Sequence, residues 1–217
     1  MNSILKFKQM KVLLSSYYPL RHTAEGKKAV QLHELKPYID GSCRREPDFE
    51  SKLPSITSLC RKEKLIGRLD EGDIVIYITN GGKGRRKLVA ILEVFKIFDS
   101  HIQAATYFNS VGIVLPNNCI VDGNLCKPYN QTHGMVSCYN EWGNMDINLW
   151  DAEYKKRARD LGKFAICKVW KNELELNKPR NISNKELTKI FGRIPGTMNP
   201  PKLTDEEWGK FKTWLGK

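Results

Sequence analysis

Two apolar segments joined by a glycine-rich turn dominate the middle of the chain. Residues 73–79 (DIVIYIT) are rich in branched and aromatic side chains, which predicts a strand. Residues 80–87 (NGGKGRRK) carry three glycines and four positive charges, which predicts a hairpin loop. Residues 88–98 (LVAILEVFKIF) return as a longer strand, and their near-continuous apolar character predicts burial on both faces. Such a pair is typical of a small closed barrel.

The segments on either side predict further strands and helices. Residues 11–16 and 164–170 predict the first and the last strand. Residues 30–39 predict an extended edge segment, because Pro37 cannot donate within a sheet. Helices are predicted for residues 56–65, 100–108 and 150–161. The fold class is therefore α+β, with a small, mostly antiparallel β-barrel surrounded by helices.

Two capping boxes predict two further helices near the end of the sequence. Ser183 stands three residues before Glu186, and Thr204 stands three residues before Glu207. In this pattern each hydroxyl and each carboxylate satisfies a backbone N–H of the first helical turn. We expect a barrel domain over residues 10–175 and a C-terminal helical extension over residues 176–217 that packs on the barrel.

The net charge of the chain favours a polyanionic partner. Lys and Arg number 36 and Asp and Glu 24, which gives a formal charge of +12. Nucleic acid is the expected partner, because binding of phosphates by cations releases counterions. We expect DNA rather than RNA. No apolar run approaches the ~18 residues of a membrane span, and lysines interrupt the first 14 residues. We therefore expect a cytoplasmic protein without a membrane partner.

The central hairpin and one charged block together suggest a family. The run EGDIVIYITNGGKGRRKLVAILEVFKIF (71–98) resembles the central hairpin of PUA-like folds, the group that includes the EVE, YTH and ASCH domains. The block DGSCRREPDFE (40–50), with the later SLCR (58–61), resembles the nucleotide-modification-associated members, which are often found near phage and defence genes. The resemblance covers residues 11–170. It implies a PUA-like barrel with an aromatic-lined pocket that binds a flipped, often modified base.

The charged block supplies the first candidate site. Arg44, Arg45, Glu46 and Asp48 place two guanidinium groups beside two carboxylates within five residues. The arginines could bind phosphates in bidentate fashion. Asp48 or Glu46 could accept a base amino group or polarise a water, and these two are the catalytic candidates. The alternative is a structural ion-pair network that fixes the loop to the barrel.

Aromatic and hydroxyl side chains at the barrel strands supply the candidate base-binding residues. Ser16 and Tyr17 end the first strand, and Tyr77 and Thr79 share one face of the central strand. Trp142 lies in a polar loop with few apolar neighbours in sequence, which favours stacking on a base. Packing at the barrel end is the alternative for each aromatic residue.

The hairpin loop supplies the remaining phosphate-binding candidates, which are Lys83, Arg85, Arg86 and Lys87. Their cations could contact a DNA or RNA backbone without reading its sequence, although charged hairpin tips are commonly only solvated. The glycines do not form a phosphate-binding P-loop, since GxxxxGK[ST] is missing and a strand follows. No nucleotide cofactor is therefore expected.

A zinc site remains an open alternative at four residues. Cys119, Cys126, His133 and Cys138 are spaced C-x6-C-x6-H-x4-C, without the tight cysteine pair of most structural zinc sites. We expect no metal and no cofactor.

The sequence thus predicts recognition of nucleic acid, with DNA preferred over RNA, through a modified base flipped into an aromatic pocket, in a phage-defence setting. One alternative is a metal-independent DNA glycosylase that excises a hypermodified cytosine-type base, with Asp48 or Glu46 stabilising the developing sugar cation. A second alternative is an RNA-binding or protein-interaction module.

Overall fold

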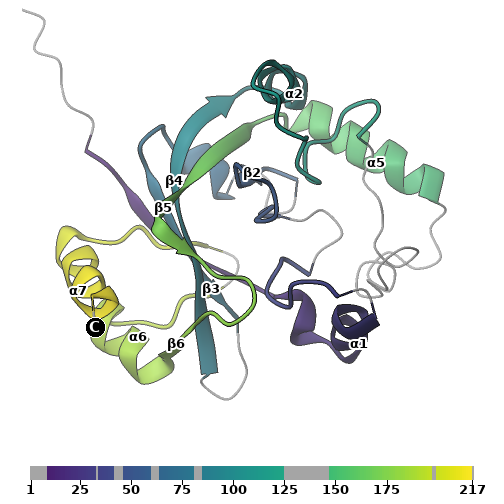
Figure 1. The fold of residues 1–217 in the computed structure, drawn as a ribbon. Coiled ribbons are helices and arrows are strands. Elements are labelled where there is room, and N and C mark those ends of the chain that lie inside the picture. Colours follow the sequence, from purple (N-terminus) through teal and green to yellow (C-terminus); the bar gives the residue numbers. More distant parts are fainter. Residues whose placement is uncertain are drawn as a thin grey trace, which may run out of the picture.

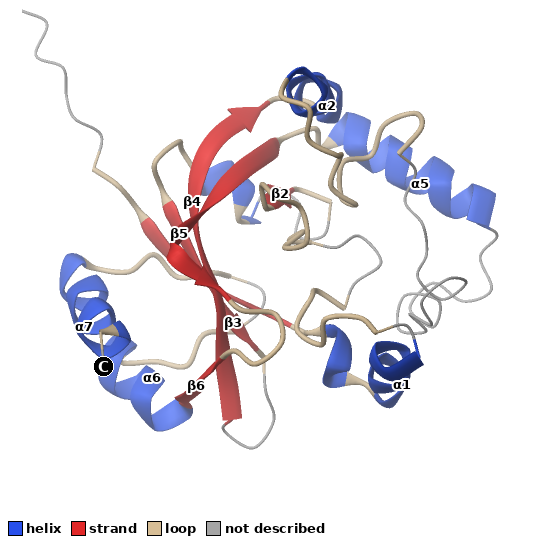
Figure 2. Ribbon diagram, in the orientation of Figure 1, coloured by secondary structure: helices blue, strands red, loops and turns tan. Residues whose placement is uncertain are grey.

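The computed structural model shows a mixed α+β fold built around one curled sheet (Figures 1 and 2). It describes residues 9–32, 34–41, 46–59, 64–80, 85–124, 147–196 and 199–216. The sheet consists of β1 (Val12–Tyr17), β2 (Ser55–Thr57), β3 (Ile74–Thr79), β4 (Arg85–Phe98), β5 (Phe164–Leu174) and β6 (Arg180–Ser183). The helices are α1 (Ala24–Leu32), α2 (His101–Ser110), α5 (Ile147–Asp160), α6 (Asn184–Phe191) and α7 (Asp205–Leu215), with short 3-10 turns η1 (Leu20–His22) and η3 (Ile66–Arg68).

The strand order is β1-β3-β4-β5-β2, and β6 pairs with the first part of β4. Only β1 and β3 run parallel, and the other pairs are antiparallel. The register of β4 shifts against both β3 and β5, and such bulges bend and twist a sheet. The 14-residue β4 can therefore curve from β6 at one end to the β2 side of the sheet at the other.

The curled sheet is a half-barrel, with β1 and β2 as its two edges. Isolated bridges join Asp40 to Pro19, just after β1, and Asp48 to Ser55 of β2, so Asp40 and Asp48 each lie beside one of these edges. The sequence predicts a small antiparallel barrel, and the described residues bear out the coarser α+β architecture with a barrel-like curl.

Each face of the half-barrel packs against a different hydrophobic cluster. Its interior holds Tyr17, Val75, Tyr77 and Leu92 together with residues of segment 38–69. Its opposite face packs on α6 and α7 through side chains such as Ile76 and Phe211. A third, smaller cluster joins α2 to β5. Among the described residues, none of the helices has the length and apolar content that crossing a bilayer requires.

Three local predictions are wrong. Residues 24–32 form helix α1, so the first part of the expected extended segment 30–39 is helical, and the Thr23 hydroxyl accepts a hydrogen bond from Gly26 N at the helix start. Ile56 lies in β2, because it pairs with Ala165 of β5 and this tertiary contact overrides the local helical pattern. The expected last strand is followed by β6, so the C-terminal extension contributes a strand as well as helices.

Candidate nucleic-acid interface

The ends of β1 and β3 bring three of the predicted base-binding residues together. Tyr17 pairs with Thr79, and Tyr77 lies two residues before Thr79 on the same face. Tyr17 and Tyr77 both belong to the interior cluster, whereas Leu14 belongs to the cluster beneath α6 and α7. By strand alternation, Ser16 lies on the Leu14 face, away from Tyr17.

The rings of Tyr17, Phe49 and Tyr77 form one edge-to-face cluster inside the half-barrel. Phe49 lies 5.4 Å from Tyr17 and 5.3 Å from Tyr77 between ring centroids. All three side chains are almost fully buried. The Tyr17 hydroxyl donates to Tyr38 O at 2.6 Å, and burial, with the charge of Asp40, raises the pKa of Tyr17 well above its ordinary value. Tyr17 is therefore a neutral donor that is already engaged, and neither tyrosine ring presents an open face.

Asp48 is held by backbone donors. Its Oδ1 accepts hydrogen bonds from Glu50 N at 2.8 Å and Ser51 N at 3.1 Å. Its Oδ2 accepts from Asn117 N at 2.7 Å. The side chain is buried, so the carboxylate ties segment 48–51 to the loop after α2. This arrangement accounts for Asp48 as a structural residue, and its catalytic role stays a prediction.

Glu46 belongs to a buried polar group inside the half-barrel. Its carboxylate accepts from Thr57 N at 2.8 Å and from the Thr57 hydroxyl, and Glu46 N donates to Asp40 Oδ2 at 3.1 Å. Burial, and to a smaller extent the charge of Glu46, raises the pKa of Cys167. Burying a carboxylate costs free energy even when hydrogen bonds offset part of that cost. An interior that only filled space would contain apolar side chains, so the buried carboxylates here indicate a role beyond packing. Carboxylate oxygens of this kind can accept from the amino group of a base.

The hairpin cations have different surroundings. Arg86 is buried, and its guanidinium donates to Thr79 O, Pro195 O and Asn184 Oδ1 at 3.3–3.4 Å. Arg86 thus bridges the end of β3 to the start of α6. Arg85 is exposed and Lys87 half-buried. Lys87 N donates to the Thr79 hydroxyl at 3.0 Å, which occupies one acceptor position of Thr79.

Several predicted residues lie outside the described part of the chain. These are Arg44, Arg45, Lys83, Trp142 and three of the four zinc candidates, Cys126, His133 and Cys138. The fourth, Cys119, is fully buried, and burial raises its pKa to about 12. Among the described residues, no group of three or more His, Cys, Asp or Glu side chains is arranged to hold a metal ion.

Tyr18 and His22, which both follow the end of β1, are further candidate binding residues. Tyr18 is 49% exposed, whereas Tyr17 beside it is 1% exposed. The centroid of the His22 ring lies 4.6 Å from that of the Tyr18 ring. The sequence feature that indicates an exposed ring here is the Tyr17-Tyr18 doublet at the end of a strand, because strand alternation directs one ring inward and the next outward.

Basic residues lie next to this aromatic pair in the chain and at the start of β4. Arg21 lies one residue before His22 and is exposed, with its guanidinium 5.3 Å from the Tyr38 ring centroid. Arg85 and Lys87 lie at the start of β4, where Lys87 N donates to the Thr79 hydroxyl at the end of β3. The end of β1 and β3 thus combines an accessible aromatic pair, nearby basic residues and a polar interior.

Comparisons with protein-family models, curated protein sequences and solved structures find no match to this chain.

Proposed function

We propose that this chain is a nucleic-acid-binding module with a PUA-like half-barrel, which holds an extruded, modified base at the shared end of β1 and β3. The observation that carries the proposal is the exposed Tyr18–His22 pair, with ring centroids 4.6 Å apart, next to the exposed Arg21 of η1. We infer that Tyr18 stacks on the base, in place of the buried Tyr17 and Tyr77.

Charge supports a nucleic acid as the ligand. The chain carries a formal charge of +12, Arg21 is exposed beside His22, and Lys87 lies at the start of β4 next to the end of β3. Aromatic stacking of bases combined with backbone neutralisation is a common mode of single-strand binding.

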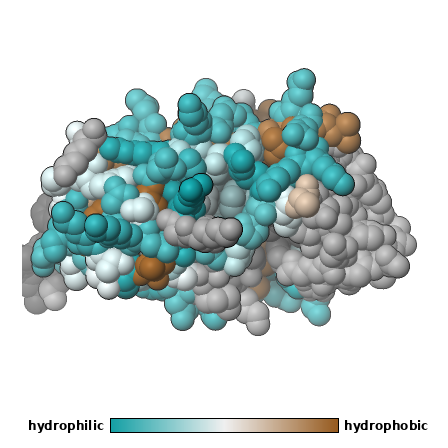
Figure 3. All heavy atoms as spheres, turned by 90° about the horizontal axis from the view of Figure 1, so that it is seen from below, coloured by the Kyte–Doolittle hydropathy of each residue, from teal (hydrophilic) through white to brown (hydrophobic). Residues whose placement is uncertain are grey.

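On the face seen from below, the described surface is largely hydrophilic and its hydrophobic areas are small and separate (Figure 3). That face therefore offers little support for an apolar protein-docking surface.

The polar interior supports selection of a base. Asp40 and Glu46 are buried carboxylates, and their oxygens are suited to the exocyclic amino group of cytosine or adenine. Unstacking a base costs a few kcal/mol, which stacking and edge hydrogen bonds offset. Both candidate carboxylates already accept hydrogen bonds within the chain, Asp48 from three backbone N–H groups and Glu46 from Thr57 N and the Thr57 hydroxyl. Neither is therefore favoured over the other for excision of the base by a glycosylase.

Fluorescence anisotropy with labelled oligonucleotides tests the proposal. The probes are a 12-nucleotide single strand and matched duplexes with and without one 5-hydroxymethylcytosine. Removal of a stacking ring costs about 1–3 kcal/mol, so Tyr18→Ala is expected to weaken binding roughly 5- to 150-fold. Tyr18 is half exposed, so this change should leave the fold intact.

Phe95→Ala is the matched control. Phe95 is 37% exposed and carries the Lys168 ammonium 3.7 Å from its ring centroid, so it is also an accessible aromatic residue beside a cation. Equal weakening by the two variants, or no weakening by Tyr18→Ala, would contradict the proposal. Alkali-labile breaks in the modified duplex would show excision, whereas retention of intact DNA supports recognition alone.

A further inference from the structure

A basic groove lies between β6, α6 and α7, on the opposite face of the sheet from the half-barrel interior. Its volume is about 530 Å³. From α6 it is lined by Glu186, Lys189 and Ile190, and from α7 by Lys210, Thr213 and Trp214. Both sets follow the i, i+3, i+4 spacing that places three side chains on one face of a helix. Arg180 and Asn181 of β6 complete the lining.

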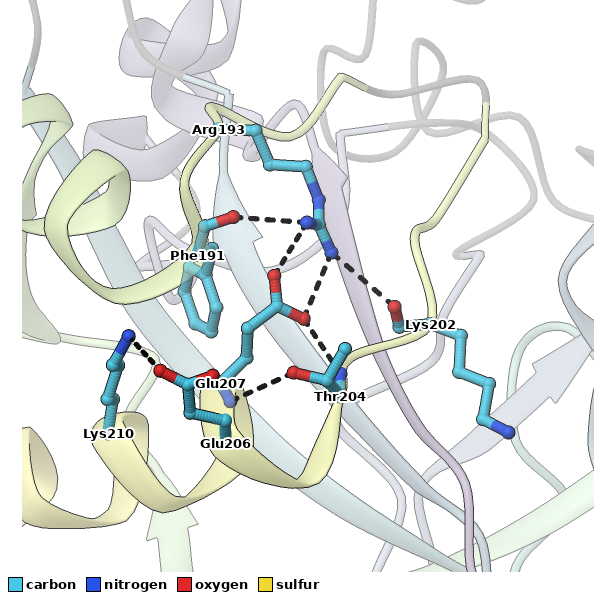
Figure 4. A network of polar contacts seen from close by, with 7 residues as sticks. All are labelled: Phe191, Arg193, Lys202, Thr204, Glu206, Glu207 and Lys210. Atoms are coloured by element: carbon cyan, nitrogen blue, oxygen red, sulfur yellow. Dashed lines mark hydrogen bonds and ion pairs between the residues drawn. The ribbon is translucent and has the colours of Figure 1, made fainter.

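A polar clamp fixes the two helices that form the groove (Figure 4). The Arg193 guanidinium donates to Glu207 Oε1 at 2.6 Å and Oε2 at 3.3 Å, and also to Phe191 O at the end of α6. The same Glu207 carboxylate accepts from Thr204 N in the capping box of α7. One bidentate pair therefore joins the end of α6 to the start of α7, so the groove is preformed.

The groove carries more positive than negative charge. Lys189 and Lys210 are exposed on its two walls, and the Arg180 guanidinium lies 4.4 Å from the Trp214 ring centroid while donating to Leu215 O at 2.7 Å. Against these three cations stands the Glu186 carboxylate, which accepts from Ser183 and from Trp214 Nε1 at 2.9 Å.

One acidic side chain near the groove competes for a cation. Lys210 pairs with Glu206 at 2.6 Å, but the Glu206 side chain is 76% exposed. Exposed pairs of this kind contribute little free energy, so a phosphate can replace Glu206 as the partner of Lys210.

Strand pairing and one buried arginine connect the groove to the proposed base-binding end of the sheet. Lys87 of β4 pairs with Asn181 of β6, and the next residue, Leu88, pairs with Arg180. The Arg86 side chain connects Thr79 at the end of β3 to Asn184 at the start of α6. We propose that the groove between β6, α6 and α7 binds the phosphodiester backbone of the same nucleic-acid strand, with Lys189 and Lys210 as phosphate contacts. This inference rests on the proposed function and adds a second contact surface to it.

The salt dependence of binding tests the groove. The probe is a fluorescein-labelled 12-nucleotide DNA single strand, titrated against the full chain between 50 and 200 mM salt. Each phosphate contact on a single strand contributes a slope of about −0.7 in log K against log salt. The double variant Lys189→Gln/Lys210→Gln should therefore lose roughly 1.4 units of slope. A fourfold rise in salt should therefore weaken the binding of the wild type roughly 7-fold more than it weakens the binding of the double variant.

The control is Lys52→Gln/Lys156→Gln, which removes the same charge at two exposed positions away from α6 and α7. If both double variants lose the same slope, or the groove variant keeps the wild-type slope, the groove proposal is overturned. If that happens while Tyr18→Ala still weakens binding, the proposed function stands without the groove. If the wild type binds no oligonucleotide at 50 mM salt, both proposals are overturned.

Discussion

Replacing Asp48 by Asn is expected to destabilise the fold strongly, although it removes only a charge. One amide group cannot accept three hydrogen bonds in the way a carboxylate does. With its oxygen kept toward Glu50 N and Ser51 N, the new NH2 group faces Asn117 N, which now donates at 2.7 Å. A hydrogen bond to a charged acceptor contributes about 1.5–3 kcal/mol, and a buried donor left without a partner costs its desolvation. Weakening of the other two bonds adds roughly 1 kcal/mol, so the expected loss is about 3–4 kcal/mol.

Urea unfolding followed by tryptophan fluorescence measures this loss as a lower midpoint at an unchanged slope. For a chain of this size the melting temperature should fall by roughly 6–16 °C. Asp160→Asn, at an exposed position at the end of α5, is the control and should stay within about 0.5 kcal/mol of the wild type. A stable Asp48→Asn protein would refute the structural role assigned to this carboxylate and would favour a chemical one.

Three other outcomes follow from buried or clamped groups. Burial lowers the pKa of His101 from 6.5 to about 4. As the pH falls, His101 is therefore protonated in the unfolded chain before it is protonated in the folded chain. The contribution of His101 to the free energy of unfolding is fully present above pH 6.5, and roughly 3 kcal/mol of it is lost as the pH falls toward 4. His101→Asn keeps an acceptor for the N–H that now donates to His101 Nδ1 and should flatten stability against pH in that window. Glu207→Ala removes the clamp on Arg193 and half of a capping box, and should lower the free energy of unfolding by about 1–2 kcal/mol in urea. Cys119 and Cys167 should resist iodoacetamide at pH 8 in the native protein, as measured by mass spectrometry, because burial raises both thiol pKa values.

Each of these outcomes has a control and a result that would contradict it. His22→Asn changes an exposed histidine, so an equal flattening of the pH profile would contradict the assignment to His101. Glu206→Ala removes only an exposed i, i+4 pair with Lys210, and a loss equal to that of Glu207→Ala would refute the clamp. Alkylation of either cysteine at the rate found in urea would show that its burial is wrong.

The sequence predicted the elements whose local signals agree with their final packing. The central hairpin follows from its β-branched residues and glycine turn, and β3 and β4 pair as expected. Both capping boxes are present, because the Ser183 and Thr204 hydroxyls need only neighbours three residues away. Local hydrogen bonds of this kind do not depend on tertiary structure.

The errors arise where tertiary contacts decide. Ile56 fits a helical pattern locally, but pairing with β5 places it in a strand. The candidate site shows the same limit: Tyr17 and Tyr18 are equivalent by composition, and only the direction of β1 buries one ring and exposes the other. Asp48 carries a carboxylate in a charged block, and only the fold reveals that Asn117 N, 69 residues away, donates to it.

Photo-crosslinking tests the central claim most directly. A single-stranded oligonucleotide with one 5-iodouracil is bound to the full chain and irradiated, and the crosslinked peptide is identified by mass spectrometry. A base held at the shared end of β1 and β3 should attach to Tyr18 or His22, and Tyr18→Ala should reduce the yield. Crosslinks confined to α2 or α5, with none at Tyr18 or His22, would contradict it.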